Sequence, residues 1–168
     1  IVRSMGSNPE DYAHTGGLRY APNVGKIPAV AISTNHADLL SQLLKEEKDL
    51  QVYLATHCEI LPDAPSFNVI GELRGTESPD EIIVVSGHLD SWDVSEGAHD
   101  DGSGCVQAIE VLRIFKAMGY KPKKTIRAVM YMNEENGLRG GIEYAKQVEK
   151  KKEKHIAAME SDRGGFTP

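Results

Sequence analysis

The sequence has few cysteines, no excess of positive charge and no long apolar run. Its only two cysteines, Cys58 and Cys105, lie in different segments, which argues against a disulfide framework and against a cysteine-based zinc site. The net charge of −6 gives no indication of a nucleic-acid partner. Because no apolar run approaches the roughly 20 residues needed to cross a bilayer, the sequence predicts no membrane span.

The remaining composition is that of an ordinary soluble globular protein, with 40% hydrophobic and 26% charged residues in a chain of 168. This length allows one domain or parts of two. The chain shows no signal-peptide pattern at its start, no internal repeat and no low-complexity segment. The lysine-rich run 150–154 indicates a solvated helix end rather than a binding surface.

The first part of the chain predicts a loop-rich start, then a strand and a helix. Turn-forming Gly, Pro and Asn residues are frequent in residues 1–27. Residues 27–33 favour a strand, and Thr34 or Asn35 can cap the following helix, along which leucines recur with helical spacing. Two further strand candidates and a turn follow, at residues 50–55, 67–73 and 75–80.

The second part of the chain alternates strands with helices. Short apolar, β-branched runs predict buried strands, and longer stretches with helical periodicity predict helices. The expected order is strand 82–85, helix 105–118, strand 125–132, helix 138–151 and strand 156–159. This alternation predicts an α/β fold, in which helices flank a mixed, largely parallel sheet with right-handed crossovers.

Acidic or imidazole side chains follow each of these three strands. They are His88 and Asp90 after the first, Glu134 and Glu135 after the second, Asp162 after the third, and Asp100 in the loop before the first helix. If the strands are neighbours, these groups converge at the edge where open α/β sheets bind ligands. Buried unpaired carboxylates cost several kcal/mol each, so such a cluster requires cations. Two divalent ions roughly 3.5–4 Å apart would neutralise it.

Each part of this pattern is weak alone. Glu134 and Glu135 fit a solvated turn, and Asp90 fits a turn or a cap. Asp101 is best explained as the N-cap of the following helix. The complete set is more specific, because every candidate follows a predicted strand in a repeating unit. The glycines after Asp101 also allow the start of the helix to approach closely.

Four motifs together resemble the di-zinc aminopeptidase family, the zinc exopeptidases. They are Gly-His-Leu-Asp-Ser-Trp-Asp-Val at 87–94, Asp-Asp-Gly-Ser-Gly at 100–104, the pair Glu134 and Glu135, and Met-Glu-Ser-Asp at 159–162. The closest similarity is to the plasma glutamate carboxypeptidase branch, and residues 2–29 are similar to the protease-associated domain inserted in that branch. The resemblance therefore covers nearly the whole chain.

The resemblance implies two zinc ions and a role for each residue. The ligands would be His88 and Asp162 for one zinc, Glu135 for the other, and Asp100 for both. Asp90 would orient His88, and Glu134 would be the general base that takes a proton from the attacking water. The peptide bond after Asp100 is usually cis in the family.

One family ligand has no counterpart in this sequence. The second zinc of the family has a further His in a later loop, and His99 is better explained as a surface or loop-packing residue than as its substitute. The chain is therefore expected to be an inactive part of a longer enzyme. Residues 1–49 would be a partial protease-associated domain, and residues 50–168 the N-terminal part of an incomplete catalytic domain.

The function that the resemblance implies is zinc-dependent hydrolysis of dipeptides or short peptides with a free amino terminus. The alternatives are a longer-peptide aminopeptidase, a single-zinc enzyme resembling glutaminyl cyclase, and an inactive peptidase-like module that serves binding. Retention of the implied site residues favours an enzyme, since the chain contains His88, Asp100, Glu134, Glu135 and Asp162. The resemblance also implies a peptide as partner and a secreted or periplasmic location, and it allows a homodimer.

Overall fold

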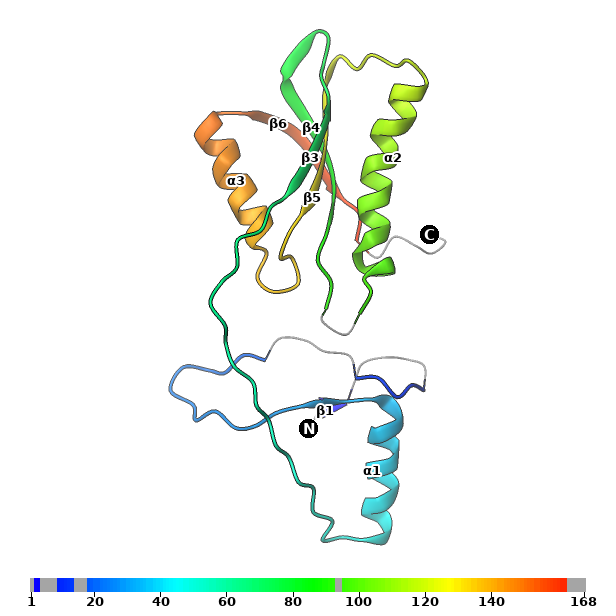
Figure 1. Cartoon of the computed structure of the whole chain (residues 1–168), viewed down its shortest axis with the longest axis vertical. Helices are drawn as coiled ribbons and strands as arrows, with labels where there is room; N and C mark the ends of the chain where they lie inside the picture. Colours follow the sequence, from blue (N-terminus) through cyan, green and yellow to red (C-terminus); the bar gives the residue numbers. More distant parts are fainter. Residues whose placement is uncertain (1, 4–8, 14–17, 93–94, 163–168) are drawn as a thin grey trace. The chain divides into compact units, whose positions relative to one another are not determined.

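The computed structural model describes residues 2–3, 9–13, 18–92 and 95–162. The chain divides into two compact units, Ile1–Asp63 and Ala64–Pro168 (Figure 1). Among the described residues, no helix has both the length and the apolar character that crossing a bilayer requires.

The first unit contains a two-stranded sheet and one helix. β1 (Val2–Arg3) pairs in parallel with β2 (Ala31–Ile32), and α1 (Thr34–Glu46) follows shortly after β2. Of the predicted strand 27–33, only the two residues of β2 that pair with β1 are in a strand.

The N-cap of α1 is Ser33, whose Oγ accepts a hydrogen bond from the amide of His36 at 3.1 Å. The sequence predicts Thr34 or Asn35 in this role, and that prediction is wrong. Both side chains bind the preceding loop instead. Thr34 Oγ1, for example, accepts a hydrogen bond from the amide of Glu10 at 2.9 Å.

Two predictions for residues 50–80 need correction. Residues 51–68 form no regular secondary structure, so the predicted strand 50–55 is wrong. Tyr53 in this segment is 95% exposed, and an extended apolar run becomes a strand only where a neighbour supplies partners for its backbone groups. The predicted turn 75–80 is shorter than expected, because a strand already begins at Ser78.

The second unit is built on a four-stranded mixed sheet in the order β3–β5–β4–β6. Its strands are β3 (Val69–Leu73), β4 (Ser78–His88), β5 (Lys124–Tyr131) and β6 (Lys154–Glu160). β4 pairs in parallel with β5 on one side and with β6 on the other, whereas β3 pairs antiparallel with β5. The predicted mixed, largely parallel sheet is confirmed.

Two helices cover opposite faces of this sheet, α2 (Ser103–Ala117) and α3 (Arg139–Lys151) (Figure 1). Successive side chains of a strand point to opposite faces, so two buried clusters form, one under each helix. The cluster under α2 contains Cys105, Ala108, Ala128 and Met130, and the cluster under α3 contains Ile82, Val84 and Val129 with Tyr144 packed against them.

A network of polar side chains centred on Arg127 crosses the α3 face. The guanidinium of Arg127 on β5 donates hydrogen bonds to Glu72 Oε1 and Glu153 Oε2, both at 2.6 Å, and to the hydroxyl of Tyr144 at 2.9 Å. The same hydroxyl lies 2.8 Å from Nε2 of His155 on β6. The network therefore links β3, β5, α3 and β6 through a single guanidinium.

Replacing Arg127 by Leu should destabilise the protein by about 3 kcal/mol, because Glu153 and the partly exposed Glu72 lose their cationic partner. Urea unfolding monitored by circular dichroism measures this change. Arg113→Leu is the control, since its ion pair with Glu110 lies at the exposed surface and should contribute little. Equal losses in the two variants would contradict the structural role of Arg127.

Candidate metal centre

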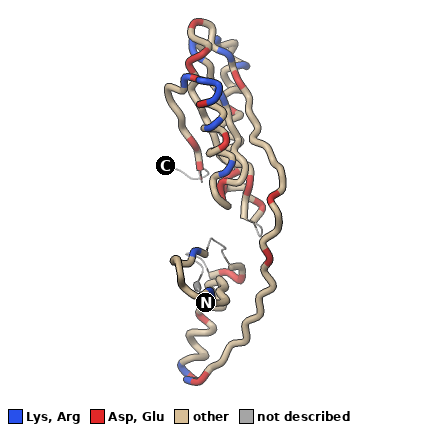
Figure 2. The backbone as a smooth tube through the Cα atoms, turned by 90° about the vertical axis from the view of Figure 1, so that its left-hand side faces the viewer, with Lys and Arg blue, Asp and Glu red and all other residues tan. Residues whose placement is uncertain are grey.

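The candidate centre lies at the carboxyl end of β4. The loop after β4 leads to α2 on one face of the sheet, and the loop after the neighbouring β5 leads to α3 on the other face (Figure 1). Such a switch point is where open α/β sheets bind their ligands. Asp and Glu residues, red in Figure 2, gather on the loops at this end of the sheet.

His88 is the last residue of β4, and its side chain is only 1% exposed. Its Nδ1 lies 2.9 Å from the main-chain oxygen of Asp90. Because a carbonyl oxygen can only accept, Nδ1 carries the proton, and Nε2 of the neutral ring presents a lone pair. This Nε2 atom is buried and has no hydrogen-bond partner among the residues that the structure describes.

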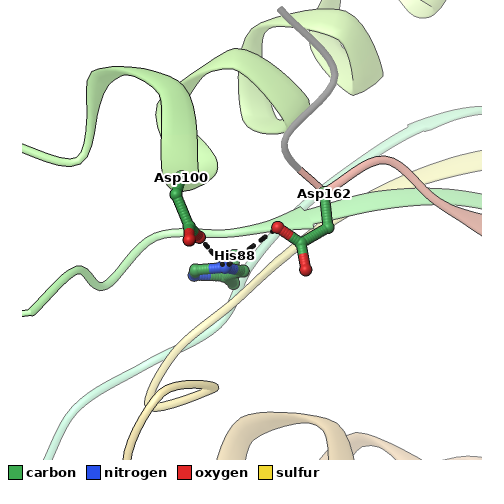
Figure 3. Close-up of side chains that lie close together, drawn as sticks. All are labelled: His88, Asp100 and Asp162. Atoms are coloured by element: carbon green, nitrogen blue, oxygen red, sulfur yellow. Dashed lines mark ion pairs between the residues drawn. The ribbon is translucent and has the colours of Figure 1, made fainter. Parts of the chain in front are cut away.

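Carboxylates from three different loops surround that nitrogen. Asp100 Oδ1 lies 3.2 Å from His88 Nε2, while Glu134 Oε2 and Asp162 Oδ1 each lie 4.0 Å from it. Figure 3 shows Asp100 and Asp162 approaching the imidazole ring from different directions. One potential ligand atom from each of His88, Asp100 and Asp162 lies within 4.8 Å of the others.

These residues fit a divalent metal ion. Carboxylates that face an imidazole lone pair repel it unless a cation lies between them, and imidazole nitrogen with carboxylate oxygen is a donor set that zinc accepts. The pKa of His88 also indicates that this site favours a positive charge. Burial lowers the pKa of His88, but the hydrogen bond to the Asp90 carbonyl and the charges of Asp101 and Glu134 outweigh it, so the pKa is raised overall.

Glu135 lies outside the three-residue cluster, although its loop is the one that brings Glu134 to His88. Burial, followed by the charge of Asp100, raises the pKa of Glu135. Its Oε1 atom is buried without a hydrogen-bond partner in the described part of the chain. A second buried atom with unused ligand capacity therefore lies in the same acidic environment.

Asp90 lies beside His88, but its carboxylate has a different contact from the one that the resemblance implies. The main-chain oxygen of Asp90 is the hydrogen-bond partner of the ring, whereas its carboxylate is 3.7 Å from Nδ1. The two carboxylate oxygens accept hydrogen bonds from the amides of Glu134 and Glu135, at 2.9 and 3.1 Å. Asp90 thus connects the loop after β4 to the loop after β5.

Asp101 accepts two hydrogen bonds, and the sequence predicts only one of them. The N-cap of α2 is Gly102 rather than the predicted Asp101, although Asp101 Oδ1 still accepts a hydrogen bond from the amide of Gly104 at 3.0 Å. Its Oδ2 accepts another from the amide of His88 at 2.9 Å, a contact that no local pattern indicates. A Cβ atom at Gly104 would overlap the Ser161 carbonyl oxygen, so the predicted close approach is confirmed. The peptide bond between Asp100 and Asp101 is cis, as the resemblance implies.

The profile of peptidase family M28 matches residues 68–167. The chain belongs to peptidase family M28. Bovine carboxypeptidase Q is 37% identical and human carboxypeptidase Q is 36% identical to it over all 168 residues. The crystal structure of a peptidase M28 precursor from Shewanella amazonensis covers 95% of the chain with a TM-score of 0.83 and 43% identity. The chain spans 36% of the length of each of these three proteins.

These similarities confirm the family and the branch that the sequence motifs resemble, since carboxypeptidase Q is another name for plasma glutamate carboxypeptidase. M28 peptidases depend on metal ions, which agrees with the donor set around His88. His99, which the sequence predicts to be a surface or loop-packing residue, does not belong to the cluster, and its main-chain oxygen accepts a hydrogen bond from Ser103 Oγ at 2.8 Å.

Asp100→Asn should lower zinc affinity by at least about 100-fold, because it removes the charge of a proposed ligand. Loss of a group that only hydrogen-bonds to a metal ligand already costs about 10–100-fold in affinity. Competition with a fluorescent chelator measures the affinity. Glu96→Gln removes one charge from the same loop at an exposed position and should leave zinc affinity unchanged. Equal effects in the two variants would indicate that net charge, rather than ligation, attracts the ion.

Proposed function

We propose that the protein is a zinc-dependent exopeptidase that hydrolyses dipeptides or short peptides with a free amino terminus. The main support is the buried Nε2 of His88, which has no hydrogen-bond partner in the described structure and faces carboxylates of Asp100, Glu134 and Asp162. The similarity to carboxypeptidase Q favours a peptidase over a binding module.

The proposed ligands divide between two zinc ions. His88 and Asp162 would hold one ion, Glu135 would hold the other, and Asp100 would serve as a ligand for both. When bound, the two ions would polarise the peptide carbonyl group and acidify the attacking water. Asp90 keeps both glutamates in place through their backbone amides.

Glu134 is the proposed general base. Its carboxylate oxygen lies 4.0 Å from His88 Nε2, at the margin of the ligand cluster rather than inside it. From there it would take the proton of the attacking water and deliver it to the leaving amine. Glu135 follows it directly in the same turn, and adjacent residues can point apart, which allows one glutamate to reach the metal and the other to reach the water.

The domain assignment and the location remain proposals that rest on sequence similarity. Residues 1–49 would belong to a protease-associated domain and residues 50–168 to the catalytic domain. A secreted or periplasmic location and a homodimer are expected from the same resemblance.

The first test is the number of metal ions. Elemental analysis of the full-length protein, purified in the presence of zinc, should find about two zinc ions per chain. A single ion would favour the enzyme resembling glutaminyl cyclase. A value near zero would contradict the metallopeptidase proposal.

The adjacent glutamates should differ when each is replaced by Gln. Glu134→Gln should retain zinc but reduce turnover of a dipeptide by about 10²–10⁴-fold, because only the proton acceptor is lost. Glu135→Gln should reduce zinc content itself. Steady-state kinetics and elemental analysis on the same samples separate the two outcomes, and near-normal turnover of Glu134→Gln would exclude it as the base.

A further inference from the structure

The two glutamates lie in a loop that is closed at its base. The loop leaves β5 at Met132 and enters α3 at Gly140, and the Gly140 amide donates a hydrogen bond to the Met132 carbonyl oxygen at 2.9 Å. Inside the loop, the amide of Leu138 donates to the Glu134 carbonyl oxygen at 3.1 Å. The positions of Glu134 and Glu135 therefore depend on the geometry of this base.

Asn68, from a segment more than 60 residues earlier in the chain, completes the base of the loop. Its Oδ1 accepts a hydrogen bond from the amide of Met132 at 2.9 Å, and its Nδ2 donates one to the carbonyl oxygen of Gly140, also at 2.9 Å. An amide N–H can only donate and a carbonyl oxygen can only accept, so these contacts fix the orientation of the Asn68 side chain. Only a side chain with one donor and one acceptor can satisfy both groups.

The position of Asn68 follows from the sheet. It directly precedes β3, whose first residue Val69 pairs with Met130 near the end of β5. Beyond this pair the β3–β5 ladder stops, and the Asn68 side chain instead connects the end of β5 at Met132 with the start of α3 at Gly140. A Cβ atom at Gly140 would overlap both the Met132 carbonyl oxygen and Asn68 Oδ1, so the base of the loop has no room for a larger residue.

We propose that Asn68 is a positioning residue of the metal centre, which fixes the base of the glutamate loop and through it the places of Glu134 and Glu135. This inference rests on the proposed peptidase function. Asp90 holds the loop by the amides of the two glutamates, from the side of β4, and Asn68 holds its base from the side of β3. Without Asn68, the two ends of the loop lose their shared partner while the contacts of Asp90 remain.

The test compares Asn68→Ala and Asn68→Asp with Thr76→Val in the full-length, zinc-loaded protein. Asp can accept from Met132 but cannot donate to Gly140, so it retains only half of the interaction. Thr76 is the matched control, because its Oγ1 also donates to a main-chain oxygen, that of Pro122 at 3.1 Å, at the opposite end of β3 and β5. Its loss should not reach the glutamate loop.

Asn68→Ala should lower kcat for a dipeptide by about 100-fold with little change in KM, since a displacement of about 1 Å at a catalytic group has this effect. Asn68→Asp should lower kcat less. Hydrogen–deuterium exchange in the zinc-free protein should be faster for the backbone amides of residues 132–140 in both Asn68 variants, and unchanged there in Thr76→Val.

Two results would overturn the inference. One is loop exchange and kcat in Asn68→Ala that match those of Thr76→Val. The other is exchange that accelerates equally throughout residues 64–162, because Asn68 would then act on global stability. If the unmodified protein hydrolyses no peptide, the proposed function fails, but exchange at the loop still decides the role of Asn68. If Asn68→Ala does not fold, the milder Asn68→Asp variant provides the same comparison.

Discussion

One buried carboxylate, that of Asp101, connects the end of β4, which carries His88, with the start of α2, which directly follows the loop of Asp100. It is 1% exposed, and its two oxygens accept hydrogen bonds from the amides of His88 and Gly104. Burial raises the pKa of this carboxyl group in spite of both bonds, which indicates the cost of holding a charge there. Together with the hydrogen bond from Cys105 Sγ to the His88 carbonyl oxygen at 3.0 Å, these bonds hold the end of β4 next to the start of α2, where Asp100 faces His88.

The acidic groups of the second unit lie in two different electrostatic environments. On the α3 face, the carboxylates of Glu72 and Glu153 are matched by the guanidinium of Arg127, so the protein supplies its own cation. At the end of β4, three carboxylates converge on one imidazole, whose Nδ1 donates to a carbonyl oxygen and whose Nε2 faces the carboxylates. The first group of carboxylates is neutralised by a cation of the protein itself. The second group surrounds an imidazole lone pair without such a cation among the described residues, which is the electrostatic environment of a metal site.

Much of this arrangement could be predicted from the sequence because its signals are local. The strands of the second unit follow from short apolar runs, and acidic residues at strand ends indicate where the chain turns at the ligand edge. The contacts that orient these residues could not be predicted, since Asp90 binds amides 44 and 45 residues away and Asn68 binds groups 64 and 72 residues away. The errors have a similar origin. Ser33 is the helix cap, while its neighbours Thr34 and Asn35 bind another loop, and residues 50–55 pair with no strand in the described part of the chain.

The register of the sheet connects these separate contacts. The amide of Ser161 donates to the carbonyl oxygen of Ser86 at 3.0 Å, which continues the β4–β6 pairing beyond the last residue of β6 and brings Asp162 beside His88. On the other side, the pairing of His88 with Tyr131 fixes where the glutamate loop begins. Side chains alternate between the faces of a sheet, so a slip of one residue in either pairing would turn one ligand away from the others. The candidate metal centre therefore depends on the β4–β5 and β4–β6 registers together. The long-range hydrogen bonds of Asp90, Asp101 and Asn68 lie at the ends of these paired strands.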